Sequence, residues 1–171
     1  MITSPTAPRP ERRAVWPDLA FLRAHPAHWI ALGCGAGLSP RAPGTLGTLA
    51  ALPPYALLTH LPTTVYWAVL VAAALIGVWA CGRTGRALGQ ADHPAMVWDE
   101  LTAFLIVLPF APASPWGWLA AFGLFRLFDI WKPFPIGWLE RRVTGGGGVM
   151  LDDLVAAAYS IAILQGVQRW M

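Results

Sequence analysis

The feature that most limits the possible folds is an uncharged, apolar stretch over residues 64–81. A run of about 18 apolar residues without charge is long enough for a membrane-spanning helix. The chain as a whole is also apolar, because 56% of its 171 residues are hydrophobic and 12% are charged. A soluble domain carries about 25% charged residues. This balance excludes a disordered chain, a basic nucleic-acid-binding domain and a coiled coil. The ten Trp residues are typical of helix ends at a lipid–water interface.

Proline- and glycine-rich breaks divide the chain into a tail and five apolar helical segments. Residues 1–26, rich in Pro and Arg, predict a polar N-terminal tail, and residues 27–171 predict a single membrane-embedded domain. We expect an all-α, multi-pass membrane helical bundle of about five membrane-embedded helices. The third and fourth are short for a span, so they either cross or form a short hairpin that enters without crossing. The segments are residues 45–60, 64–81, 96–110, 116–131 and 149–168, with polar loops at residues 82–95 and 132–148.

The charged residues predict an orientation for these segments. If the N-terminus is cytoplasmic and the five segments alternate, the two turns on the far side, residues 61–63 and 111–115, hold no charged residue. The near side then holds all nine acids and eleven of the twelve bases, and Arg169 alone lies on the far side. This arrangement obeys the positive-inside rule. It gathers every carboxylate at the cytoplasmic face of the membrane.

Three clusters of charged residues stand at the ends of apolar segments. Charge at membrane depth is costly, and neighbouring like charges add to that cost unless a cation binds them. Each cluster therefore calls for an explanation. The clusters are Asp99 and Glu100; Arg126, Asp129 and Lys132; and Asp152 and Asp153, which follow four consecutive glycines.

The second and third clusters also carry geometric expectations. The spacing of Arg126, Asp129 and Lys132 places them on one face of a helix. Asp152 and Asp153 are expected in the first turn of a helix that follows a flexible glycine loop. Taken singly, each cluster has a structural explanation, such as an ion pair or complementation of the helix dipole by the two acids. Their common membrane face favours one shared site.

The chemistry that suits such a site is the binding of a divalent cation and a phosphate. Mg²⁺ takes oxygen ligands and often shares them with a substrate phosphate. Arg126 and Lys132, the single Lys of the chain, would hold phosphate oxygens. The expected cofactor is therefore Mg²⁺. Its expected ligands are Asp99, Glu100, Asp129, Asp152 and Asp153.

The charged clusters lie within four ordered sequence motifs. These are Gly35-Ala-Gly-Leu-Ser-Pro-Arg-Ala-Pro-Gly-Thr-Leu-Gly47, Val97-Trp-Asp-Glu100, Phe125-Arg-x-x-Asp-x-x-Lys-Pro-x-Pro-Ile136 and Gly145-Gly-x-Gly-x-Met-x-Asp-Asp153. In this order and spacing, over about residues 29–166, the chain resembles the phosphatidylglycerophosphatase A family of bacterial membrane enzymes. Gly147 departs from the pattern, since a larger residue is expected in the glycine loop.

The resemblance implies Mg²⁺-dependent removal of the terminal phosphate from phosphatidylglycerophosphate, giving phosphatidylglycerol, at the cytoplasmic face of the bacterial inner membrane. The implied partners are the phospholipid substrate and the membrane, without nucleic acid. Direct attack by an activated water and a phospho-aspartyl intermediate both remain open. The expected catalytic residues are Asp99, Glu100, Asp129, Lys132, Asp152 and Asp153, and the expected phosphate-binding residues are Arg126, Lys132, Arg41, Thr45 and His93.

The alternative from another class is a non-enzymatic multi-pass cation transporter or channel with a carboxylate-lined site. Transporters place their carboxylates near the bilayer midplane. Here the acids crowd helix ends on one side, and the adjacent basic pair suits a phosphate better than a free cation. Turnover that depends on Mg²⁺ separates the two hypotheses.

Overall fold

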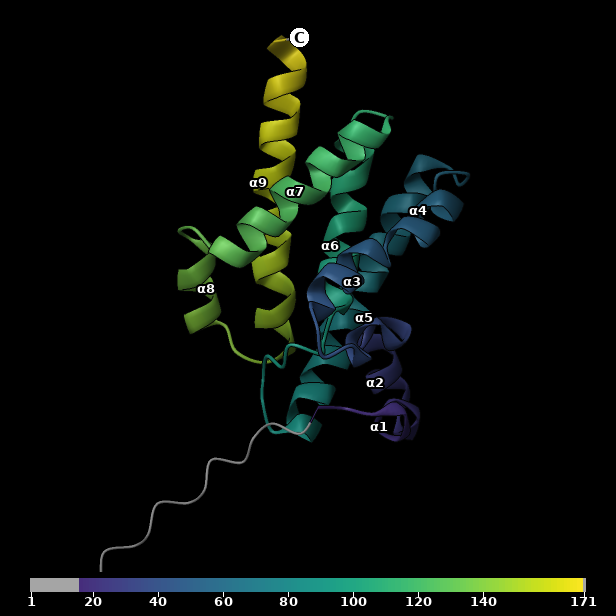
Figure 1. Cartoon of the computed structure of the whole chain (residues 1–171), viewed down its shortest axis with the longest axis vertical. Coiled ribbons are helices and arrows are strands. Elements are labelled where there is room, and N and C mark those ends of the chain that lie inside the picture. Colours follow the sequence, from purple (N-terminus) through teal and green to yellow (C-terminus); the bar gives the residue numbers. More distant parts are fainter. Residues whose placement is uncertain (1–15, 171) are drawn as a thin grey trace, which may run out of the picture.

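The computed structural model describes residues 16–170, and this part of the chain is all-helical, without a strand. The predicted all-α class is thereby confirmed. Figure 1 shows α9 along the long axis of the molecule, with its C-terminal end opposite α1 and α2. The helices are α1 (Leu19–Ala24), α2 (Pro26–Ala31), α3 (Pro43–Leu49), α4 (Leu52–Leu58), α5 (Thr63–Leu88), α6 (Trp98–Val107), α7 (Pro115–Trp131), α8 (Ile136–Arg142) and α9 (Gly146–Trp170), with 3-10 turns η1 (Gly33–Leu38) and η2 (Leu108–Phe110).

Helices α5 and α9 form a long antiparallel pair, and each has the length and apolar composition to cross a membrane. Gly146, the first residue of α9, lies against the last turns of α5. A side chain there would overlap the carbonyl of Val78 and lie 2.5 Å from the backbone nitrogen of Gly82. Glycine thus lets the two backbones meet closely, as small residues do in membrane bundles. The outer face of α5 is apolar, with Val71 and Leu75 exposed.

The expected count of about five membrane-embedded helices is not confirmed, since within residues 16–170 α5 and α9 alone qualify as spans. The first expected segment divides into two helices of seven residues, α3 and α4. The break precedes Pro53, because a proline fits the first turn of a new helix but not a helix interior. Helix α6 has ten residues and rises about 15 Å, roughly half the hydrocarbon thickness. Helix α7 runs obliquely over α6 and α9 (Figure 1).

Both segments expected to be polar loops contain helix. Helix α5 continues to Leu88, and Gly89 ends it in the left-handed conformation, with φ at 73°. Residues 132–148 contain α8 as well as the start of α9, so three of the four consecutive glycines are helical. Asp152 and Asp153 therefore lie in the second turn of α9 rather than in the first, where the helix dipole is strongest. This placement corrects the predicted glycine loop.

The main hydrophobic core lies where α5, α6, α7 and α9 meet. Phe104 of α6 and Phe125 of α7 are fully buried there, with their ring centroids 5.7 Å apart. Trp98, at the start of α6, donates a hydrogen bond from its indole to the carbonyl of Ala73 on α5 at 2.9 Å. These contacts fix the first turn of α6, which carries Asp99, relative to α5 and α7.

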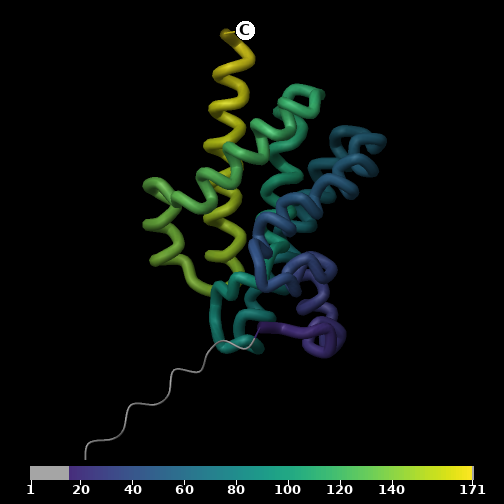
Figure 2. The backbone as a smooth tube through the Cα atoms, viewed as in Figure 1, coloured from purple at the N-terminus to yellow at the C-terminus, as the bar shows by residue number. Residues whose placement is uncertain are grey.

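Residues 1–15 of the predicted polar tail lie outside the described residues. From Trp16 onward the chain packs against the end of the molecule opposite the C-terminus (Figure 2). The indole of Trp16 donates to the carbonyl of Leu38 at 3.0 Å, and Leu22 of α1 is buried. Asp18 caps α1 by accepting a hydrogen bond from the backbone nitrogen of Phe21.

Candidate functional site

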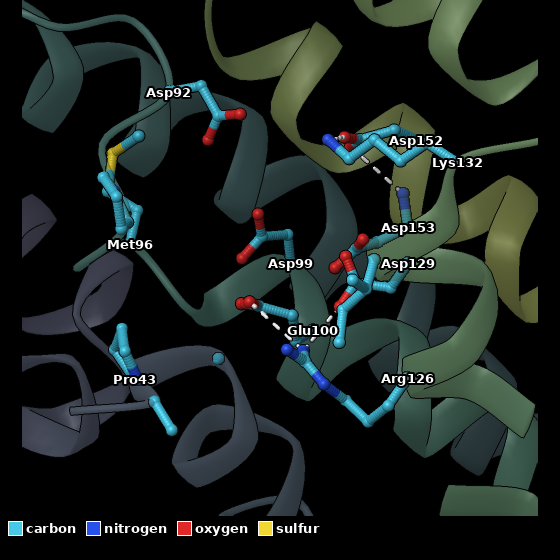
Figure 3. Close-up of a pocket in the computed structure, with 14 residues that line it drawn as sticks. Pro43, Asp92, Met96, Asp99, Glu100, Arg126, Asp129, Lys132, Asp152 and Asp153 are labelled. Carbon is cyan, nitrogen blue, oxygen red and sulfur yellow. Dashed lines mark hydrogen bonds and ion pairs between the residues drawn. The ribbon is translucent and has the colours of Figure 1, made fainter. Parts of the chain in front are cut away.

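A cavity of about 270 Å³ opens where α3, α6, α7 and α9 approach the loop that follows α5. Figure 3 shows acidic side chains from three of these elements turned toward this space, with Arg126 and Lys132 at its margin. All three charged clusters of the sequence meet here. The lining residues are Ala42, Pro43, Gly44, Asp92, Pro94, Met96, Asp99, Glu100, Arg126, Asp129, Ile130, Lys132, Asp152 and Asp153.

The most deeply placed acids are Asp99, Glu100 and Asp153, which we term the inner acidic group. One carboxylate oxygen of each lies within 4.8 Å of the other two. Asp99 is 7% exposed and Asp153 is 3% exposed. One buried oxygen of each carboxylate has no hydrogen-bond partner among residues 16–170. Because a buried carboxylate without a partner is strongly disfavoured, the inner acidic group has the chemistry of a binding site for a hard cation.

Arg126 connects the inner acidic group to α7. Its guanidinium forms an ion pair with Asp129, one turn along the same helix, and lies 3.6 Å from Glu100 Oε1. The shared helix face predicted for Arg126 and Asp129 is thus present. Gly44 of α3 lies against this pair, because a Cβ there would overlap Glu100 Oε1 and lie 2.9 Å from Arg126 Nη1. The absence of a side chain lets α3 form one wall of the site.

Lys132 ends α7 with a left-handed backbone, φ 47°, which is uncommon outside glycine. Its ammonium donates hydrogen bonds to Asp152 Oδ2 at 2.7 Å and to Glu140 Oε1 at 2.9 Å. Burial alone would lower the pKa of Lys132, but the hydrogen bonds and charges of these two carboxylates outweigh it and raise the pKa above its usual value. Lys132 is therefore protonated throughout the physiological pH range.

Two residues near the cavity were missed by the sequence analysis. Asp92, in the loop after α5, lines the cavity, and Glu140 of α8 reaches Lys132. With Asp152 they form an outer acidic group, in which one oxygen of each carboxylate lies within 4.8 Å of the others. Asp92 and Glu140 are exposed, whereas Asp152 is buried. The position of Asp92 next to His93 could have indicated a site residue. Glu140 lay in a segment expected to be a loop, and no sequence pattern marked it as a site residue.

Three expected phosphate-binding residues do not line the cavity. Arg41 is exposed before α3, and Thr45 is half-buried within it. His93 is buried, and its Nδ1 accepts a hydrogen bond from the backbone nitrogen of Ala95 at 3.1 Å. Burial lowers the pKa of His93 despite the opposing charge of Asp92, so the ring is neutral at pH 7. Contact of these three residues with phosphate stays a prediction. The expected site residues that line the cavity are Asp99, Glu100, Arg126, Asp129, Lys132, Asp152 and Asp153.

The fold and the site define a membrane-associated, all-helical protein whose cavity is lined by carboxylates, with two basic side chains at its margin. A sequence model of the phosphatidylglycerophosphatase A family matches residues 29–168, and the chain belongs to this family. It is 46% identical to phosphatidylglycerophosphatase A of Escherichia coli (strain K12) over 142 residues, which is 82% of this chain and 83% of the relative. It is 40% identical to phosphatidylglycerophosphatase A of Haemophilus influenzae over 149 residues, 86% of this chain and 91% of the relative.

A third relative has a different name. The chain is 41% identical to a putative phosphatidylinositol-3-phosphatase of Bacteroides thetaiotaomicron over 150 residues, which is 83% of this chain and 92% of the relative. No solved structure matches the chain. These relatives do not support the alternative of a cation transporter or channel.

Proposed function

We propose that this chain is a membrane lipid phosphatase that removes the terminal phosphate of phosphatidylglycerophosphate to give phosphatidylglycerol. The observation that carries the proposal is the convergence of the inner acidic group, Arg126 and Lys132 on one cavity. The relatives named phosphatidylglycerophosphatase A, at 40% and 46% identity, supply the reaction and the substrate.

The inner acidic group would hold a divalent cation, and we propose Mg²⁺ because its available donors are carboxylate oxygens, which hard cations prefer. The three buried oxygens without partners support this assignment. When bound, the cation supplies charge neutralisation for phosphoryl transfer and acidity for a water molecule. Asp129 and Asp152, also expected as ligands, are paired with Arg126 and Lys132. Their coordination of the cation stays a prediction.

Arg126 and Lys132 would bind the non-bridging oxygens of the phosphate and orient it for displacement of the glycerol oxygen. Both side chains are charged and held by carboxylates, so their donors are organised before the substrate arrives. Asp99 and Asp129 are the candidates to accept a proton from the attacking water. A phospho-aspartyl route would instead use a carboxylate of the cavity as the nucleophile, and both routes fit this arrangement.

We infer a multi-pass topology in the bacterial inner membrane with the site toward the cytoplasm. Helices α5 and α9 would cross the bilayer, and α6 and α7 would form an embedded hairpin between them. Arg83 and Arg86 lie in the last turns of α5, and Arg141 and Arg142 end α8. The C-terminal ends of α5 and α8 both point toward the end of the molecule that holds α1 and α2 (Figure 1). Arg169 lies at the other end of α9. The positive-inside rule places the end richer in arginine in the cytoplasm.

Phosphate release from defined lipids tests the proposed function. The purified full chain in uncharged detergent micelles receives phosphatidylglycerophosphate or phosphatidylinositol 3-phosphate, with Mg²⁺ or with EDTA. We expect release from phosphatidylglycerophosphate that EDTA stops and excess Mg²⁺ restores. Preferential turnover of phosphatidylinositol 3-phosphate would replace the proposed substrate by the one in the name of the Bacteroides relative. No Mg²⁺-dependent release from either lipid would contradict the proposal.

A further inference from the structure

The two acidic groups of the site differ in how their charge is compensated. In the inner group, Asp99 and Asp153 are buried and Glu100 is half-buried, and each retains one buried oxygen without a hydrogen-bond partner among residues 16–170. Arg126 approaches this group at 3.6 Å but pairs more closely with Asp129. In the outer group, the buried member, Asp152, already receives a hydrogen bond from Lys132. Among the described residues, the charge of the inner group is thus compensated only by Arg126 at 3.6 Å from Glu100, whereas the outer group contains the Lys132 ammonium itself.

The ammonium of Lys132 occupies the space between two members of the outer group. It lies 2.7 Å from an oxygen of Asp152 and 2.9 Å from one of Glu140, so two of the three possible donors are engaged. The remaining member, Asp92, is exposed and has no hydrogen bond with Lys132 among the described residues. The left-handed backbone of Lys132 directs this side chain from the end of α7. Glu140 holds it from α8.

We propose that Lys132 takes the place of a second divalent cation, so that the site binds one ion at the inner acidic group, and that Glu140 positions the Lys132 ammonium. This inference rests on the proposed function. Phosphoryl-transfer sites often use two metal ions about 4 Å apart to clamp the reacting phosphate. A fixed ammonium supplies the same sign of charge and three hydrogen-bond donors. The ammonium cannot lower the pKa of a bound water, so in this proposal only the ion at the inner acidic group can activate water.

Removal of the ammonium should convert the outer group into a second ion site. In Lys132→Met the unbranched stem remains, but the charge is lost, and three carboxylates lie within reach of one ion. In Lys132→Met combined with Glu140→Gln, one of these donors loses its charge. Lys132→Arg keeps a positive charge at the same position. The three variants separate a role in ion count from a general role in folding.

Counting bound Mn²⁺ on the full chain in uncharged detergent tests the inference, with the free ion measured by its electron paramagnetic resonance signal. We expect one tight ion per wild-type chain and per Lys132→Arg chain, and two per Lys132→Met chain. The double variant should return to one, and Glu140→Gln alone should remain at one. A structural role of Glu140 would not produce this dependence on Lys132.

Two ions on the wild-type chain would overturn the inference, and that measurement requires no variant. A folded Lys132→Met chain that still binds one ion would also overturn it. The result is distinguishable from failure of the proposed function. Two bound ions with Mg²⁺-dependent release of lipid phosphate would remove the inference alone, whereas one bound ion without any phosphate release would remove the proposed function alone.

Discussion

Gly44→Ala should impair catalysis while leaving the fold intact. The new methyl carbon would overlap Glu100 Oε1 and lie 2.9 Å from Arg126 Nη1, where ordinary contact begins at 3.4 Å, so the guanidinium must retreat by about 0.5 Å and the carboxylate by more. Both are ends of flexible side chains, so the cost to stability is small. A displacement approaching 1 Å at a catalytic group costs about 10²-fold in rate. We therefore expect kcat/KM to fall by about 10- to 100-fold.

The control for this variant is Gly123→Ala on the exposed side of α7, where a Cβ would have no atom of residues 16–170 within 4 Å. Initial rates of phosphate release and thermal unfolding are measured for both variants in the same detergent. Gly123→Ala should keep wild-type kinetics and gain about 0.5–1 kcal/mol of stability from the lower entropy of its unfolded state. If Gly44→Ala retains wild-type kcat/KM, the placement of Glu100 and Arg126 against α3 is not important for catalysis. If Gly44→Ala unfolds instead, the close contact of Gly44 with Glu100 and Arg126 is needed for folding.

Three further expectations follow from the packing and the topology. Gly146→Ala should lose about 1–3 kcal/mol of stability through overpacking against α5, whereas Gly147→Ala, whose Cβ would have no described atom within 4 Å, should be neutral or stabilising. Thermal unfolding of both variants tests this difference. Equal effects would refute the close contact between Gly146 and α5. A variant without both cysteines should keep full activity, because neither thiol lines the cavity, and its inactivity in a folded protein would return thiol chemistry to consideration. In that background, single cysteines at Thr63 and Gly89 should be labelled from the periplasm and the cytoplasm respectively, and labelling of both from one side would contradict a spanning α5.

The positions of the charged residues made the site predictable from the sequence. Asp99 and Glu100 are adjacent acids, as are Asp152 and Asp153, and both pairs lie at the ends of apolar runs, where charge is too costly to be incidental. The spacing of Arg126 and Asp129 directly encodes their shared helix face. These signals depend on residue type and spacing alone, so they do not require knowledge of how the helices pack.

The parts of the structure that depend on tertiary contacts were not predictable in the same way. The glycine run before Asp152 is typical of a flexible loop, but Gly146 and Gly148 are helical. The backbones of α5 and Val143 approach these two glycines so closely that no side chain fits there. Helix α8 follows two prolines and contains a glycine, so its propensity is weak, and Glu140 was missed with it. The count of about five membrane-embedded helices is not confirmed, because residues 45–60 form two short helices on either side of the break before Pro53 and α6 has only ten residues.

In the proposed function, the inner acidic group binds the cation on which phosphate release depends. The direct test is a Mg²⁺ titration of phosphate release with Asp153→Asn, against Asp18→Asn, which removes the carboxylate that caps α1 away from the cavity. Asparagine keeps the shape of the side chain and removes its charge. We predict that Asp153→Asn folds, loses about 10²-fold or more in kcat and needs more Mg²⁺ to reach half of its maximal rate, while Asp18→Asn matches the wild type. Wild-type turnover with an unchanged Mg²⁺ midpoint in Asp153→Asn would contradict a catalytic cation site at the inner acidic group.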